Sequence, residues 1–330
     1  MHIRKGNDFL MKRTIKCIVF VSIFLAILMV LSKVFIPKNN TLEAGIGKRK
    51  ITASGVYTEP ENTIDVIVLG DSESYTSFIP LELWNQYGFT SYVCGTPAQR
   101  ITDSYSILNK AFKRQKPKLV IMEANSLYTK NGVIRHIRDY VQKYLPIFEY
   151  HDRWKNLSKD DFLKTPEYTE IVNDKGYRYS NKSNKVKKSK RDNYMEENES
   201  AKKIPSDNVK HIKEIKKLCD KNGAKFMLYN SPTPANWSFD KHNGVEKVAK
   251  DLGVEYIDFN LKVDELKINW KKDSQEKRGE HLNYGGALKI TNYLGIYLKE
   301  NNELPDHRQD EKFEAWNEAY RNFQKETEEL

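Results

Sequence analysis

Residues 66–77 read VIVLGDSESYTS. The apolar run that ends at Leu69 is typical of a buried strand, and a glycine, an aspartate and a serine follow it directly. A turn after a strand needs only the glycine or the aspartate. The serine, Ser72, would lie at the end of the strand, where it can also act as a nucleophile. The rest of the sequence shows which other groups such a serine would have.

Apolar runs alternate with helical patterns along most of the chain. We expect strands at Asp65–Leu69, Ser91–Cys94, Lys118–Glu123, Lys225–Tyr229 and Val254–Phe259. Apolar residues at helical spacing predict helices between them, over Leu81–Tyr87, Thr102–Lys116, Val209–Asn222 and Val245–Leu252. This alternation predicts an α/β fold of three layers, with helices on both faces of a mostly parallel sheet. Ligands of such sheets bind at the carboxyl ends of the strands, which is where Ser72 would lie.

Residues 130–205 interrupt the alternation inside a domain that we expect to cover residues 63–304. The first half has aromatic and helical character, and the second half is highly charged and poor in apolar residues. A solvated loop and a cover that contacts a polyanion are both open for the second half. We interpret the whole as an insertion over the active-site edge, because loops at that edge carry specificity.

The tail, residues 305–330, has an amphipathic pattern. Phe313, Trp316, Tyr320 and Phe323 are spaced by 3, 4 and 3 residues, so they form one stripe of a helix. We expect this stripe to pack back on the domain, and docking on a partner is the alternative.

The N-terminus predicts a membrane anchor. Residues 1–16 are basic, and residues 17–36 are apolar apart from two serines and Lys33. Twenty helical residues span roughly 30 Å, about one hydrocarbon core. Basic residues before the span favour a cytoplasmic N-terminus, with a polar linker at 37–62 and the domain outside. A cleaved signal peptide is the alternative, although no A-x-A-like site follows the run and the run is long for such a signal.

Composition excludes some classes of protein. With 330 residues, 39% of them apolar and 30% charged, the chain fits one large domain and is too polar for a polytopic membrane protein. A net charge of +10 suits nucleic acid, an anionic membrane or an anionic polymer. An outside domain disfavours nucleic acid. The three cysteines form no disulfide framework, and we expect no metal or cofactor because the chain has no CxxC motif or His-rich cluster.

A nucleophilic serine needs a base, and His281 is the best candidate. It stands in RGEHLNYGGALKITNYL, in a polar loop after the last predicted strand and before a helix signal. That position returns the chain to the sheet edge where Ser72 lies. His242 also follows a strand and is the competing candidate.

Together these residues resemble a known superfamily. GDS after the first strand, Gly95 after the second, Asn125 after the third and a late His-Leu-Asn before a helix are similar to the SGNH hydrolases, also called GDSL lipases and esterases. The resemblance covers about residues 65–125 and 225–298. It implies a flavodoxin-like fold with a parallel sheet.

The resemblance also implies roles for these residues. Ser72 would be the nucleophile and His281 the general base, while Gly95 and Asn125 would form the oxyanion hole with the amide of Ser72. Two positions depart from the pattern. The usual Gly-x-Asn-Asp block reads Glu-Ala-Asn-Ser at 123–126, which weakens the assignment of Asn125. The usual acid three residues before the histidine is replaced by Arg278.

Three acids near the histidine could take the place of the missing one. They are Asp273, Glu276 and Glu280. We expect Asp273 to orient the imidazole, because a neighbour as close as Glu280 would usually point away from it. A Ser–His dyad with a backbone carbonyl as the orienting group is the alternative, since catalysis survives at a reduced level without the acid.

An anchored outside domain with the late HLNYGG resembles one branch of the superfamily, the membrane-tethered proteins of cell-envelope acylation. Examples are the D-alanyl lipoteichoic acid transfer protein and the alginate acetylation proteins. The resemblance implies a membrane-bound O-acyltransferase as partner, an acyl ester on Ser72 and an envelope glycopolymer, either a polysaccharide or a teichoic-acid-like polymer, as acceptor. Excluding water favours transfer, and the insertion would be the cover. A deacylating carbohydrate esterase and a non-catalytic scaffold with the same fold are the alternatives.

Overall fold

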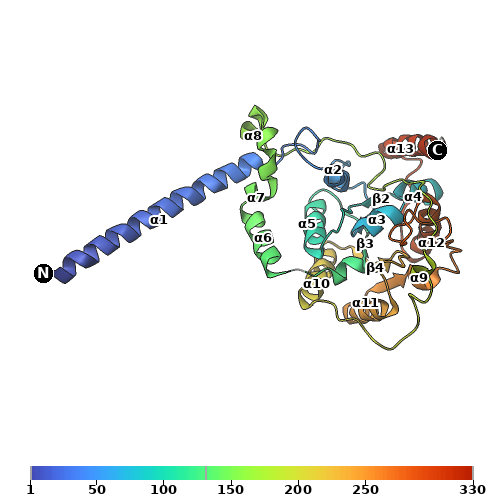
Figure 1. The fold of residues 1–330 in the computed structure, drawn as a ribbon. Helices are drawn as coiled ribbons and strands as arrows, with labels where there is room; N and C mark the ends of the chain where they lie inside the picture. The colour runs from blue at the N-terminus through green and yellow to red at the C-terminus, as the bar shows by residue number, and fades with distance from the viewer. Residues whose placement is uncertain (1, 131, 329–330) are drawn as a thin grey trace. The chain divides into compact units, whose positions relative to one another are not determined.

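The computed structural model describes residues 2–130 and 132–328 (Figure 1). The chain divides into two compact units. One unit joins residues 1–47 with residues 131–169, and the other joins residues 48–130 with residues 170–330. The segment expected to be one insertion at 130–205 is therefore shared between the two units.

The second unit is built on one parallel sheet. Its strands are β1 (Val66–Leu69), β2 (Ser91–Val93), β3 (Leu119–Glu123), β4 (Lys225–Asn230) and β5 (Glu255–Asp258). They lie in the order β2-β1-β3-β4-β5, with every neighbouring pair parallel. This is the flavodoxin-like order, in which the strand order reverses between β1 and β3 and ligands bind at the carboxyl ends near that point. The predicted fold class is confirmed, and the strand ends agree to within one residue.

Helices cover both faces of the sheet. One group packs together on one side and consists of α3 (Ser72–Ser77), α4 (Pro80–Tyr87), α12 (Tyr284–Asn301) and α13 (Glu314–Glu328). The other group consists of α5 (Ile101–Ala111), α10 (Ser206–Lys221) and α11 (Phe239–Leu252). The strands between these layers are almost entirely buried, as the continuous apolar runs of a parallel sheet require. Two further short helices are α2 (Lys48–Ser54) and α9 (Lys188–Arg191).

The C-terminal tail packs back on this unit. Phe313, Trp316 and Phe323 are buried, and the ring of Trp84 in α4 lies 5.6 Å from that of Trp316. The aromatic stripe of the tail thus faces its own domain, and burying aromatic side chains supplies much of the apolar area that holds such a helix.

The second unit contains two cysteines, Cys94 and Cys219, which are both buried and unpaired. Burial raises the pKa of both thiols, so they remain protonated. They act as small apolar groups in the core.

The first unit contains the N-terminal helix α1 (His2–Phe35). Its segment Met11–Phe35 is long and apolar enough to cross a membrane, and it is the one such helix within the described residues. Three more helices belong to this unit, α6 (Val133–Tyr144), α7 (Ile147–Tyr150) and α8 (Lys159–Leu163), with a 3₁₀ turn η3 (His151–Lys155) between the last two. The predicted anchor at 17–36 falls on α1, and its orientation across a membrane stays a prediction.

Candidate active site

Ser72 follows a sharp turn at the end of β1. Gly70 has a φ of +149°, which side-chain-bearing residues rarely adopt, and a Cβ there would lie 2.6 Å from that of Glu123. Asp71 then caps α3, because its Oδ1 accepts a hydrogen bond from the amide of Glu73 at 3.0 Å. These two residues make Ser72 the first residue of α3 and leave it partly exposed at the edge of the sheet.

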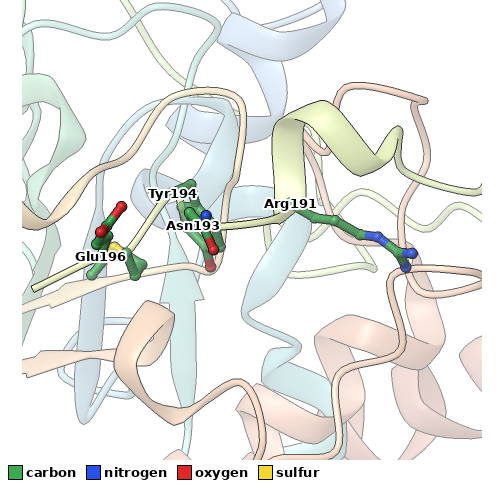
Figure 2. A pocket seen from close by; sticks show the side chains of 5 residues that line it. Arg191, Asn193, Tyr194 and Glu196 are labelled. Atoms are coloured by element: carbon green, nitrogen blue, oxygen red, sulfur yellow. The ribbon is translucent and has the colours of Figure 1, made fainter.

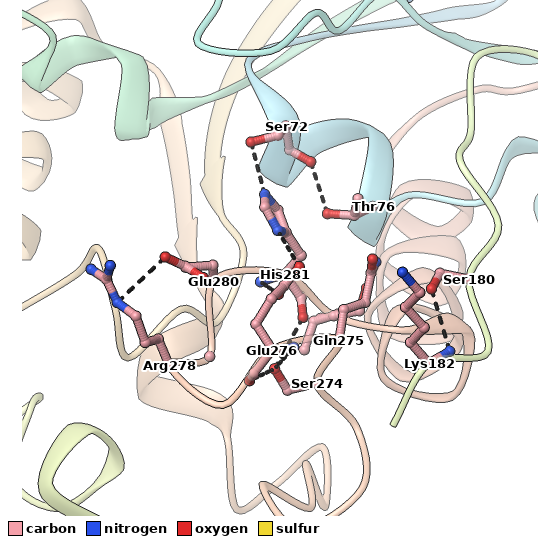
Figure 3. Close-up of polar contacts among 12 residues, drawn as sticks. Ser72, Thr76, Ser180, Lys182, Ser274, Gln275, Glu276, Arg278, Glu280 and His281 are labelled. Atoms are coloured by element: carbon pink, nitrogen blue, oxygen red, sulfur yellow. Dashed lines mark hydrogen bonds and ion pairs between the residues drawn. The ribbon is translucent and has the colours of Figure 1, made fainter. Parts of the chain in front are cut away.

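His281 reaches the same edge from a loop before α12. Ser274 and Leu282 pair as an antiparallel bridge, and the amide of Gln275 donates to the carbonyl of His281 at 3.0 Å. Asn283 ends the loop by capping α12 through the amide of Gly286. The folded loop places Nε2 of His281 2.9 Å from Oγ of Ser72 (Figure 3).

Glu276 lies on the other side of the imidazole. Its Oε1 is 3.0 Å from Nδ1 of His281, and its Oε2 accepts the backbone amide of His281 at 3.1 Å. Burial acts to raise the pKa of Glu276, but the hydrogen bonds and electrostatic attraction of His281 outweigh it and hold that pKa below its usual value. An ionised carboxylate only accepts hydrogen bonds, so Nδ1 carries the proton and Nε2 is left to accept from the Ser72 hydroxyl.

The expectation that Asp273 orients the imidazole is not met. The carboxylate of Asp273 instead pairs with Lys289 of α12 and accepts the backbone amide of Asn269 at 2.6 Å. The reason is the bridge that folds the loop back on itself after Asp273, because it brings Glu276 rather than Asp273 opposite the histidine. Glu276 was one of the three candidate acids, but its sequence distance from His281 gave no reason to prefer it.

Glu280, the third candidate acid, turns away from the imidazole. Its Oε1 lies 3.4 Å from Nε of Arg278, the residue that replaces the usual acid (Figure 3). Nδ1 of His281 faces the carboxylate of Glu276, which therefore takes the place of the backbone carbonyl in the dyad alternative.

Gly95 and Asn125 both lie beside the turn that carries Ser72, which we call the serine turn (residues 70–74). A Cβ on Gly95 would lie 2.4 Å from Oγ of Ser74 and 3.1 Å from the carbonyl oxygen of Asp71, so only glycine fits this close approach. The Asn125 amide nitrogen donates to Asp71 at 3.3 Å and to Glu73 at 3.4 Å. The two residues are therefore brought to the edge predicted for them, and their part in an oxyanion hole stays a prediction.

A buried group of three carboxyls lies directly behind the serine turn. The carboxyl oxygens of Asp71, Glu73 and Glu123 lie within 4.8 Å of one another. Burial raises the pKa of all three, and mutual repulsion raises those of Glu73 and Glu123 further. This carboxyl cluster was not foreseen, although Glu73 follows Ser72 directly in the sequence.

Amides surround the carboxyl cluster. Asn230 donates to Glu123 at 2.7 Å and Asn236 donates to Glu73 at 2.8 Å, while Oε2 of Glu73 is buried without a partner. Within the described residues this is the one group with the spacing of a metal site. Lys241 and three asparagines face the three carboxyls. These carboxyls can therefore remain buried as protonated and hydrogen-bonded groups. The expectation of an enzyme without a metal stays a prediction.

Two arginines stack on the tyrosine that follows the serine turn. The guanidinium of Arg49 lies 3.8 Å and that of Arg178 5.2 Å from the ring centre of Tyr75. Arg49 also donates to the carbonyl of Gly95 at 3.1 Å, and Arg178 to the side chain of Gln275 at 3.1 Å. Arg49 comes from α2, inside the stretch expected to be a polar linker. Sequence reasoning missed both arginines because nothing nearby in the chain points to the serine.

The second half of the expected insertion contributes to this edge. The amide of Arg178 donates to the carbonyl of Tyr75 at 2.8 Å. The amide of Asn184 donates to the carbonyl of Ser274, also at 2.8 Å. The amide of Lys187 donates to Lys277 in the same way. Residues 178–187 thus run along the loop that carries His281, which we call the histidine loop (residues 273–283), and hold it in place.

Two other features lie apart from Ser72. His242, the competing histidine, places Nδ1 2.9 Å from Asp258, a buried residue at the end of β5. A hollow of about 320 Å³ is lined by residues 191 and 193–196 and includes none of the residues around Ser72 (Figure 2). Neither feature supplies a group to the serine.

No protein-family model and no curated protein matches the chain. Solved structures do resemble it. Esterase EstA from Pseudoalteromonas sp. is 11% identical, with 72% of this chain and 98% of that chain covered at a TM-score of 0.39. The lipase/acylhydrolase from Enterococcus faecalis is 13% identical, with 73% and 99% covered at a TM-score of 0.35. Likeness at this level concerns the fold and transfers no activity to this chain.

Proposed function

We propose that the chain is a serine enzyme of ester chemistry, in which Ser72 carries the acyl group. The observation that supports this is the line of hydrogen bonds Ser72–His281–Glu276, at 2.9 and 3.0 Å. It joins a nucleophile, a base and an orienting acid from two distant parts of the chain. Such a constellation is recognised by geometry and roles rather than by position in the sequence.

The proposed mechanism has two halves. The Ser72 hydroxyl gives its proton to Nε2 of His281 as its oxygen attacks the ester carbonyl, and Glu276 stabilises the imidazolium that forms. The carbon–oxygen bond of the donor breaks, and His281 returns the proton to the leaving alcohol. A second hydroxyl then gives its proton to His281 as its oxygen attacks the acyl ester, the bond between the acyl carbon and Oγ of Ser72 breaks, and His281 returns the proton to Oγ of Ser72.

The second hydroxyl decides between an esterase and an acyltransferase. We propose a sugar or polyol hydroxyl of an extracytoplasmic glycopolymer as acceptor, and a membrane-bound O-acyltransferase as the partner that supplies the acyl group. The apolar helix α1 and the net charge of +10 support a membrane-attached protein with an anionic polymer as partner. Residues 178–187, packed along the histidine loop, support a site that can limit the access of water.

Hydrolysis is the second candidate, because the same three residues would activate water. A non-catalytic scaffold would account for the replacement of the usual acid by Arg278. The carboxylate of Glu276, 3.0 Å from Nδ1 of His281, supports the catalytic proposal instead.

Labelling with a serine-reactive fluorophosphonate tests the proposal. The full-length protein in detergent should take up one adduct by intact mass, and Ser72→Ala and His281→Ala should each remove it. Ser180→Ala is the matched control, because the Ser180 carbonyl accepts the amide of Tyr284 close to the histidine loop and its own side chain does not contact His281. An adduct that survives Ser72→Ala, or a folded protein that takes up none, would reject the assignment.

Transfer and hydrolysis are separated by the product. With p-nitrophenyl acetate as donor and glycerol as a model polyol, a transferase yields acetylated glycerol in proportion to the glycerol added. A hydrolase yields free acetate at all glycerol concentrations. Ser72→Ala should abolish either product, so this measurement distinguishes the two reactions without depending on the natural acceptor.

A further inference from the structure

The unit that contains α1 displays large apolar side chains on its surface outside the helix itself. Seven of them are between 59% and 81% exposed. One is Leu42, and the other six lie in α6, η3 and α8. We call these six the apolar collar: Ile137, Tyr140, Tyr144, Trp154, Phe162 and Leu163. Large apolar groups that lie side by side in water, as Tyr140 and Tyr144 do, mark a surface that binds a membrane or another protein. The collar therefore needs a covering surface.

Helix α6 shows that the exposure follows a pattern. Ile137, Tyr140 and Tyr144 are spaced by 3 and 4 residues, so they share one face of the helix. The rings of Tyr140 and Tyr144 lie 4.9 Å apart. A helix of a soluble protein turns such a face toward its own core, whereas here it faces outward.

The collar is fixed to one end of the candidate membrane span. The amide of Ile147 in α7 donates to Oγ of Ser32 at 3.3 Å. Arg153 in η3 donates to the carbonyl of Phe35 and forms an ion pair of 2.8 Å with Asp161 in α8. Figure 1 shows α7 and α8 beside the C-terminal end of α1.

The ion pair explains why these contacts persist. The side chains of Arg153 and Asp161 are only 3% and 5% exposed. Removing either partner would leave the other as an unpaired buried charge. The ion pair therefore holds the 3₁₀ turn and α8 at the end of α1. Apolar side chains of α8 and of the turn are thus held at the level where α1 would leave the hydrocarbon core.

The chemistry of the collar matches that level of a bilayer. Tyrosine and tryptophan are enriched at membrane–water interfaces, where an apolar ring and a polar tip each find a suitable neighbour. Exposed lysines lie beside the collar residues in the sequence, at Lys155, Lys159 and Lys164, and the last of them pairs with Asp160. Amphipathic segments of this kind lie in the plane of the interface and contact lipid headgroups with their charges.

We propose that the apolar collar lies in the headgroup–acyl boundary of the bilayer that α1 crosses. It would form a second attachment to the membrane, made of the helices that follow the sheet strand β3 in the sequence. The proposal commits to lipid as the covering surface. It does not depend on the reaction at Ser72, so its failure would leave the proposed enzyme intact.

Depth-dependent fluorescence quenching tests the proposal on the full-length protein. Tyr140→Cys is labelled with an NBD fluorophore in a Cys17→Ser background, in which Cys94 and Cys219 are buried, and the protein is reconstituted into phosphatidylcholine–phosphatidylglycerol vesicles. Ile296→Cys is the matched control, because Ile296 is 52% exposed on α12 in the other unit. We expect the label at 140 to be quenched by lipid-borne nitroxides and several-fold less by aqueous iodide than the label at 296.

A label at a second position controls for a local effect of the Tyr140→Cys substitution. Leu163→Cys, at the most exposed position of the collar, should respond as Tyr140→Cys does, and both proteins should still bind the fluorophosphonate. Labels that iodide quenches as strongly as the label at 296, and that nitroxide lipids leave unaffected, would overturn the proposal. That result is also expected if a membrane protein, absent from the vesicles, covers the collar.

Discussion

The serine turn (residues 70–74) and the histidine loop (residues 273–283) bring their reacting side chains to one edge of the sheet by different means. The serine turn is short and buried, and its cap and tight glycine come from adjacent residues. The histidine loop is held by contacts with distant segments, which include residues 178–187 and Lys289 of α12. The comparison indicates that a nucleophile can be placed by local sequence, whereas its base and acid depend on the tertiary structure around them.

The largest effect should come from the residue that local sequence places. Ser72→Ala should reduce ester turnover by about 10⁴-fold or more, because the acyl ester can no longer form. Stability should hardly change, since a partly exposed hydroxyl contributes little packing. Steady-state turnover and thermal unfolding, measured on the same preparation, give both quantities.

His281→Ala should match Ser72→Ala and not add to it in the double variant. Residues that act as one unit show this non-additivity. Turnover that survives in Ser72→Ala, or losses that add in the double variant, would mean that the two residues do not work together.

A smaller loss of activity should come from the acid. Glu276→Gln should lower kcat by about 10²–10⁴-fold, because an amide can donate to Nδ1 and so favour the wrong imidazole tautomer. Glu280→Gln is the matched control, since Glu280 pairs with Arg278 and leaves the imidazole alone. Equal losses in the two variants would contradict the role of Glu276.

Asp273→Asn should affect stability more than activity. Asp273 is buried and pairs with Lys289, whose side chain is 29% exposed, so water weakens the pair somewhat. Losing it should cost about 1–3 kcal/mol, which lowers the Tm of a domain of this size by roughly 2–4 °C per kcal/mol. The rate of fluorophosphonate labelling should stay within a few-fold of the wild type. A large loss of labelling at an unchanged Tm would return the orienting role to Asp273.

The same contrast shows what could be predicted from the sequence. Buried apolar runs identified the five strands, because a parallel sheet must bury both faces of each strand. Helical spacing of apolar residues identified the helices between them. Ser72 and His281 followed from strand ends and the topology of such a sheet. Glu276 could not be chosen over Asp273, because the bridge between Ser274 and Leu282 that decides between them depends on packing. Arg49 lies 46 residues from Gly95 and carries no local signal.

The smallest effect should be a change in the pH dependence of stability. Burial and the charge of Asp71 raise the pKa of Glu73 well above 4.5, its ordinary value. In the pH window above that value the folded protein binds more protons than the unfolded chain, so stability falls as pH rises through the raised pKa. Glu73→Gln keeps an oxygen for Asn125 and Asn236 but cannot ionise. Its Tm relative to that of the wild type should therefore increase from pH 5 to pH 8.

Glu276→Gln provides a control of opposite sign for this measurement. Because hydrogen bonds to His281 lower the pKa of Glu276, its contribution to stability is present above its ordinary value and is lost as pH falls through the lowered pKa. The Tm deficit of Glu276→Gln should thus be present at neutral pH and shrink below about pH 4. Curves for Glu73→Gln that stay parallel to the wild type would show that Glu73 is ionised throughout, and that the carboxyl cluster holds its charges in pairs with Lys241. Opposite trends in the two variants would show that Glu73 in the serine turn is protonated, whereas Glu276 in the histidine loop is ionised.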